Sequence, residues 1–142
     1  MSDRTIGILG LGIFGSSVLT ALAKQDMNII AIDDHAEHIN QFEPVLARGV
    51  VGDITDEELL RTAGIDTCDT VVVATGENLE SSVLAVMHCK SLGVPRVIAK
   101  VKSHTAKKVL EKIGADAVIS PEFEMGRSLA QTILFHNSVD VF

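Results

Sequence analysis

Three glycines and an aspartate offer the clearest chemistry in this sequence of 142 residues. Gly10, Gly12 and Gly15 form a G-x-G-x-x-G pattern, and Asp33 follows 18 residues after Gly15. Glycine backbones at such a turn let a pyrophosphate approach closely, and the free N–H groups of the next helix can bind its oxygens. A carboxylate at the position of Asp33 can accept hydrogen bonds from both hydroxyls of a ribose. The pattern therefore predicts a nucleotide site.

The segments that flank the glycines are those that such a site requires. Residues 5–9 form a short apolar run, an amphipathic segment continues to Lys24, and residues 28–33 form a second apolar run that ends in the acid. A lone G-x-G-x-x-G also occurs in turns that bind nothing, but strand, helix and acid together indicate a dinucleotide fingerprint. Gly15 should let the first helix pack close to the strands. The inner face of that helix is expected to carry Phe14, Val18, Ala21 and Leu22.

Two adjacent acids predict which nucleotides fit. Asp34 follows Asp33, and no arginine lies nearby in the sequence. A 2′-phosphate would be repelled by these carboxylates, because like charges at short range disfavour each other. We therefore expect NAD(H), ADP or ATP to bind and NADP to be excluded.

Strand and helix patterns alternate along the whole chain. Strands are predicted at residues 5–9, 28–33, 50–53, 70–74, 96–101 and 117–119. Thr55 is expected to cap the helix that ends at Gly64, and Val83, Val86 and Met87 to face inward from the helix at residues 79–92. Six repeats of this alternation predict an α/β fold, a Rossmann-like, doubly wound, six-stranded parallel sheet. Ligands bind such sheets outside the carboxyl ends of the strands, between the first and the fourth.

Composition limits the partners. The net charge of −7 argues against nucleic acid, because phosphate backbones need a basic surface. No apolar run approaches the roughly 20 residues of a membrane span, so we expect a cytoplasmic protein without direct membrane insertion. Cys68 and Cys89 have neither CxxC nor metal-ligand spacing and are expected to be buried as small hydrophobic residues.

Groups for catalysis are not recognisable. The chain has no tyrosine, no G-x-S-x-G elbow and no metal-binding helix motif. His35 and His38 lie three residues apart, but no third ligand is evident, so a solvent-exposed helix face is the better interpretation. His104 is the one histidine expected near the strand ends. We expect a protein that binds a nucleotide and leaves it intact.

Several motifs resemble the KTN domain, also called RCK-N, of bacterial potassium-transport regulators, the soluble subunits of the Ktr and Trk systems. The first two matching stretches are ILGLGIFG with its Asp33 and the GDIT segment at residues 52–55. The more specific ones are VVATGEN at residues 72–78 and KVLEKIGAD at residues 108–116, followed by Ser120-Pro121-Glu122. The resemblance covers essentially the whole chain and is greatest to the Ktr regulatory subunit.

The resemblance implies a protein that binds ATP, ADP or NAD(H), forms homodimers and rings, and controls a membrane-embedded potassium transporter subunit from its cytoplasmic side. It implies that Asp33 holds the ribose, that Asp53 and Ile54 contact the adenine, and that Lys100 lies near the phosphates. Glu122 matches a family glutamate near the terminal phosphate and its cation, such as Mg²⁺. With the fingerprint, the expected site residues are Gly10, Gly12, Ile13, Phe14, Gly15, Asp33, Asp34, Asp53, Ile54, Thr75, Gly76, Asn78, Lys100 and Glu122.

Two features depart from the resemblance. Ktr subunits carry arginine where this chain has Ile13, which removes a cation that would meet a γ-phosphate. Family members also continue into a second small domain, so we expect residues 1–136 to form the nucleotide-binding domain and residues 137–142 a tail toward a domain absent from this chain. A truncated NAD-dependent oxidoreductase is the alternative.

The last predicted helix has no obvious cover. It starts at Pro121 and carries Met125, Leu129 and Ile133 on one stripe. An uncovered apolar stripe commonly marks an interface, so we expect self-association. The alternative is that this helix folds back over one face of the sheet.

Overall fold

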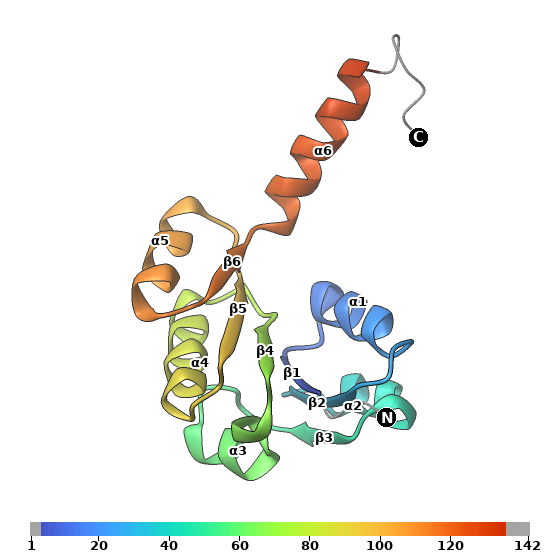
Figure 1. Cartoon of the computed structure of the whole chain (residues 1–142), viewed down its shortest axis with the longest axis vertical. Helices are drawn as coiled ribbons and strands as arrows, with labels where there is room; N and C mark the ends of the chain where they lie inside the picture. Colours follow the sequence, from blue (N-terminus) through green and yellow to red (C-terminus); the bar gives the residue numbers. More distant parts are fainter. Residues whose placement is uncertain (1–3, 136–142) are drawn as a thin grey trace.

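Six parallel strands form one sheet in the computed structural model, which describes residues 4–135. The sheet order is β3-β2-β1-β4-β5-β6, so β1 lies at the centre between β2 and β4 (Figure 1). The strands are β1 (Thr5–Leu9), β2 (Asn28–Asp33), β3 (Arg48–Val51), β4 (Thr70–Val73), β5 (Arg96–Lys100) and β6 (Ala117–Ile119). From β1 the strands are added toward one edge as β2 and β3, and then toward the other edge as β4, β5 and β6. This change of side between β1 and β4 confirms the predicted fold class and its switch point.

Helices cover both faces of the sheet. One face packs against α1 (Ile13–Leu22) and α2 (Ala36–Phe42), and the other against α3 (Glu57–Ala63), α4 (Leu79–Ser91) and α5 (His104–Ile113) (Figure 1). Two short 3-10 turns, η1 (Glu43–Val45) and η2 (Ile65–Thr67), complete the connections. Residues that alternate along a strand enter opposite layers, as in β1, where Ile8 packs toward α1 and Leu9 toward α3 and α4.

Four local details differ from the sequence-based expectations. In α1 the buried side chain is Leu19, whereas Ala21 is exposed. Met87 in α4 is exposed although it was expected to face inward, because Ala85, Val86 and Cys89 define the buried face. The cap of α3 is Asp56 and not Thr55: its carboxylate accepts the N–H groups of Glu58 and Leu59. The third strand covers residues 48–51 rather than 50–53.

The last helix, α6 (Pro121–Phe135), extends away from the sheet (Figure 1). None of its residues is buried, and Leu129 and Ile133 are 55% and 63% exposed. The alternative in which this helix folds back over the sheet is therefore wrong for the described residues. The tail expected at residues 137–142 lies outside them.

No helix within residues 4–135 combines the length and the apolar character that a membrane span requires.

Candidate functional site

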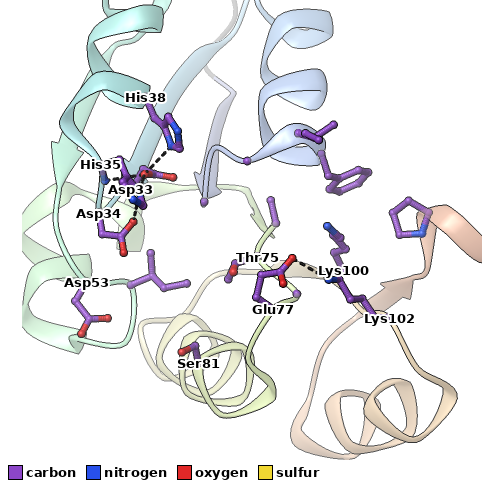
Figure 2. Close-up of a pocket in the computed structure, with 18 of the residues that line it drawn as sticks. Asp33, Asp34, His35, His38, Asp53, Thr75, Glu77, Ser81, Lys100 and Lys102 are labelled. Carbon is purple, nitrogen blue, oxygen red and sulfur yellow. Dashed lines mark hydrogen bonds and ion pairs between the residues drawn. The ribbon is translucent and has the colours of Figure 1, made fainter.

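A cavity of about 820 Å³ opens at the carboxyl ends of the central strands (Figure 2). Loops that follow β1, β2, β3, β4 and β5 and the start of α6 all contribute to its wall. The expected site residues that line it are Gly10, Gly12, Ile13, Phe14, Asp33, Asp34, Asp53, Ile54, Thr75, Gly76, Lys100 and Glu122. The cavity also has lining residues outside that set of expected site residues, namely His35, His38, Gly52, Ala74, Glu77, Ser81, Lys102 and Pro121.

The start of α1 faces this cavity with backbone N–H donors that no side chain caps. Gly12 is the N-cap of α1 and supplies no side-chain hydrogen bond, whereas Asp56, Asn78 and Ser103 cap α3, α4 and α5 with their side chains. A Cβ added to Gly12 would have no heavy atom within 4 Å. The first-turn N–H groups and the positive end of the helix dipole therefore face an open space, an arrangement suited to phosphate oxygens.

Gly15 has a packing role instead. It does not line the cavity, and a Cβ at this position would overlap the carbonyl oxygen of Gly10 and press on Ala74. Gly10 itself has a φ of 100°, a left-handed conformation that side chains other than hydrogen strain. The two glycines let the strand turn sharply into α1 and hold that helix against β4.

Asp33 is fixed at the end of β2. Its side chain is buried, its Oδ2 accepts the N–H of Leu11 at 2.7 Å, and its Oδ1 accepts the N–H of His35 at 2.8 Å. Burial alone would raise the pKa of Asp33, but the hydrogen bonds from Leu11, His35 and His38 outweigh it and hold the pKa below the usual 3.8. The carboxylate is therefore ionised at neutral pH. Its Oδ2 keeps a lone pair for a further donor, whereas the second lone pair of Oδ1 already faces His38 Nδ1.

Two histidines contact this carboxylate, which the sequence interpretation missed. His38 Nδ1 lies 3.0 Å and His35 Nδ1 3.3 Å from Asp33 Oδ1, and the two side chains point toward it in Figure 2. The nearby carboxylates raise the pKa of His35 above 6.5, and Asp34 has a larger effect than Asp33. The sequence interpretation placed His35 and His38 on a solvent-exposed helix face because no third metal ligand was evident. The structure brings Asp33 next to both histidines as a third possible ligand. His104 does not line the cavity.

Lysines occupy the opposite side of the cavity (Figure 2). Lys100 Nζ lies 5.8 Å from the centroid of the Phe14 ring and, among residues 4–135, makes no ion pair within 4 Å. Lys102 pairs with Glu77 at 2.8 Å, and this contact raises the pKa of Lys102 and lowers that of Glu77. The cavity thus has a carboxylate at one end, cations at the other and an uncapped helix start between them.

The side chains of Asn78 and Asp53 form hydrogen bonds that stabilise the local backbone. Asn78 was expected beside a nucleotide, but it does not line the cavity; its side chain accepts the N–H groups of Glu80 and Ser81 at the start of α4. The Asp53 carboxylate lies at the cavity wall and accepts the backbone N–H and the hydroxyl of Thr55, which lowers its pKa. These bonds fix the loop that follows β3.

Comparison with known proteins decides the family. The model of the TrkA-N domain matches residues 6–121, which is most of the chain. This chain belongs to the TrkA-N domain family. This TrkA-N chain is 35% identical over 137 residues to the Ktr system potassium uptake protein C of Bacillus subtilis (strain 168). That alignment covers 96% of this chain but 62% of the relative, so the chain spans less than two thirds of that protein.

Two solved structures share the fold of this TrkA-N domain. The Shewanella denitrificans Kef CTD in its AMP-bound form superimposes with a TM-score of 0.80 at 17% identity, over 96% of this chain and 83% of the other. The GsuK channel bound to NAD superimposes with a TM-score of 0.70 at 19% identity, over 84% of this chain and 22% of the channel. The resemblance to the KTN, or RCK-N, family that the motifs indicated is thereby confirmed at the level of family and fold.

Proposed function

We propose that this TrkA-N domain is a cytoplasmic, nucleotide-binding regulatory domain that reports ATP, ADP or NAD(H) to a potassium transporter or channel. The observation that carries the proposal is the uncapped start of α1, which opens into the same cavity as the ionised Asp33. Phosphates would lie against α1, and Asp33 would accept the ribose hydroxyls, one with the free lone pair of Oδ2 and one with Oδ1 in place of the His38 contact. The bound nucleotides of the Kef CTD and of GsuK support this assignment.

The family resemblance implies the remaining contacts, and the positions of the lining residues support them. Asp53 and Ile54 would contact the base, Asp34 would reinforce the choice against a 2′-phosphate, and Lys100 would approach the phosphates. Glu122, at the base of α6, would hold a divalent ion such as Mg²⁺ near a terminal phosphate. Thr75 and Gly76 would flank the nucleotide, while Asn78 would act indirectly by fixing α4.

The potassium-transport role rests on the relative. The Ktr system potassium uptake protein C is named for potassium uptake, and we infer that this chain acts on a membrane-embedded potassium transporter subunit from its cytoplasmic side. The exposed stripe of α6 would join two copies into a homodimer, and dimers would assemble into a ring. In this role the nucleotide is bound as a signal and is not converted.

Calorimetric titration with NAD, ADP, ATP and NADP tests the proposal. Asp33→Ala removes a charge-assisted pair of hydrogen bonds, which is worth roughly 1.5–3 kcal/mol, and should weaken NAD binding about ten- to a hundredfold. Asp66→Ala, an exposed carboxylate in η2 outside the cavity, is the matched control and should bind like the wild type.

Two results would contradict the proposed function. Equal affinity for NAD and NADP would show that Asp33 and Asp34 do not read the ribose. A substrate-dependent change in absorbance at the nicotinamide band would instead indicate an oxidoreductase domain.

A further inference from the structure

The contacts around Asp33 gather more ligand atoms than a ribose site needs. Within six residues the chain places a buried carboxylate and two imidazoles, with Asp33 at the end of β2, His35 as the N-cap of α2 and His38 in its first turn. One ligand atom from each of these three side chains lies within 4.8 Å of the other two. Figure 2 shows the three side chains converging at one side of the cavity.

Two of the three distances between these ligand atoms are close to those around one metal ion. Asp33 Oδ1 lies 3.0 Å from His38 Nδ1 and 3.3 Å from His35 Nδ1. In a tetrahedral site with bonds of roughly 2.0–2.2 Å, neighbouring ligand atoms are about 3.3–3.6 Å apart. The third distance, between the two imidazole nitrogens, is at most 4.8 Å, so rotation of these partly exposed imidazoles toward each other would seat an ion between them.

Hydrogen bonds alone do not satisfy all the donors and acceptors of these side chains. Three nitrogens lie within 3.3 Å of Asp33 Oδ1: the His35 N–H, His35 Nδ1 and His38 Nδ1. A carboxylate oxygen has about two lone-pair positions, so one nitrogen is in excess. His35 Nδ1 also lies 2.7 Å from Asp34 Oδ1, yet it has a single proton for two carboxylates. A cation would satisfy both imidazole lone pairs and the Asp33 carboxylate at once.

We propose that Asp33, His35 and His38 form a binding site for a divalent transition-metal ion of the zinc class. Two imidazole nitrogens and one carboxylate oxygen are ligands that Zn²⁺, Co²⁺ and Ni²⁺ prefer, whereas Mg²⁺ and Ca²⁺ prefer oxygen ligands alone. Asp33 is already oriented by its bond from the Leu11 N–H, which is the kind of support that fixes a metal ligand. The site is separate from the Mg²⁺ position assigned above to Glu122.

The metal and the adenosine nucleotide exclude each other in this arrangement. This step rests on the proposed function, in which Asp33 accepts the ribose hydroxyls. An ion that takes Asp33 Oδ1 leaves that oxygen without a free lone pair, because the His35 N–H holds the other. Linkage then requires that each ligand weaken the affinity for the other by the same factor. The domain would respond to a metal ion as well as to a nucleotide.

Titration of Zn²⁺ into the full chain without nucleotide tests the site. We expect one ion per chain, and a loss of about tenfold or more in affinity in His38→Ala and in His35→Ala. His104→Ala removes an exposed histidine at the start of α5, outside the cavity, and should bind like the wild type. Co²⁺ should give a visible absorption band that His38→Ala abolishes. Mg²⁺ alone should leave the imidazole NMR signals of His35 and His38 unchanged.

Circular dichroism establishes that each variant is folded, and His38→Gln replaces His38→Ala if that variant is not. Equal Zn²⁺ affinity in the wild type, the His38 variant and the His104 variant would overturn the site. NAD titrated with and without Zn²⁺ then tests exclusion: unchanged NAD affinity on the metal-loaded protein would overturn it. A protein that binds Zn²⁺ at these residues but binds no nucleotide would contradict the proposed function alone, and the reverse result would contradict the metal site alone.

Discussion

Gly12 and Gly15 lie in the same turn, yet an added methyl group would meet different surroundings at each. At Gly12 it would point into open space, and at Gly15 it would collide with the backbone of Gly10. We expect Gly12→Ala to fold and to lose most of its nucleotide affinity, because its methyl group would stand where a phosphate approaches. Gly15→Ala should lower the free energy of unfolding by about 1–3 kcal/mol, the usual cost of an overpacked position.

Urea unfolding and calorimetric NAD titration of both variants measure these two effects. The pair forms its own control, since the chemical change is the same. A Gly12→Ala protein with wild-type affinity would show that the start of α1 is not the phosphate site.

We expect position 13 to govern the preference for a terminal phosphate. Ile13 is 92% exposed at the start of α1 and offers no charge to a γ-phosphate. We expect the wild type to bind ATP and ADP with near-equal affinity, and Ile13→Arg to prefer ATP by about tenfold or more, since a charge-assisted hydrogen bond contributes about 1.5–3 kcal/mol. ATP and ADP dissociation constants, measured with and without Mg²⁺, test this.

Ile13→Leu is the matched control for position 13 and should leave the ratio of ATP to ADP affinity unchanged. A wild-type preference for ATP of more than about tenfold that Ile13→Arg does not increase would rule out a role for this residue.

The sequence predicted those cavity residues whose position follows from the backbone turn or from the end of a strand. Gly10, Gly12 and Asp33 follow from the order of strand, turn and strand, and the cavity lies where the parallel sheet reverses. The contacts of His35 and His38 were missed because they depend on how α2 turns back over Asp33, which no spacing rule specifies. Asn78 was assigned to a nucleotide by resemblance, although an asparagine directly before a helix is a common cap.

At the scale of elements, α6 is the helix that no other element within residues 4–135 covers. Its exposed apolar side chains, among them Met125, Leu129 and Ile133, lie on a helix that touches little else. We expect the wild type to self-associate through this helix, and Leu129→Asp with Ile133→Asp to give monomers, because two charges in an apolar interface are costly to desolvate. Light scattering over a range of protein concentrations measures the mass.

Gln131→Asp adds charge to the same helix about half a turn away from the stripe and is the control. It should associate like the wild type. A wild-type protein that stays monomeric at high concentration would contradict the prediction.

The sequence predicted which helices and strands form better than it predicted which of their side chains are buried. The apolar run of β4 indicated a strand buried on both faces, and its last three residues are buried. In α1 and α4 the periodicity did not fix which of several neighbouring apolar residues face the sheet. Leu19 and Val86 are buried while Ala21 and Met87 are exposed, because the rotation of each helix is set by packing across the sheet.

At the scale of the whole molecule, two buried thiols couple stability to alkaline pH. Burial raises the pKa of Cys68 and of Cys89 from 9.0 to about 12. A group with a raised pKa in the folded state stabilises the fold fully below its unfolded pKa and loses that contribution as the pH rises through the folded pKa. The free energy of unfolding should therefore fall between pH 9.0 and about 12.

Urea unfolding at a series of alkaline pH values measures this slope. The chain has no tyrosine, so no phenol titrates in the same range. Cys68→Ala with Cys89→Ala should be less stable at neutral pH and should show a shallower alkaline slope, the remainder coming from lysines. A slope that the double variant leaves unchanged would assign the effect to other groups.

The central place of β1 also bears on how the protein is made on the ribosome. Its first edge pairs with β2, but its second edge pairs with β4, where Ile6 meets Thr70, 64 positions later. During translation, β1, β2 and β3 can pair while that second edge is still an unpaired row of backbone groups, which other chains can join. A nascent chain thus has a period of exposure to aggregation that ends when β4 emerges. It can complete the wall of its cavity only after Glu122 has been synthesised.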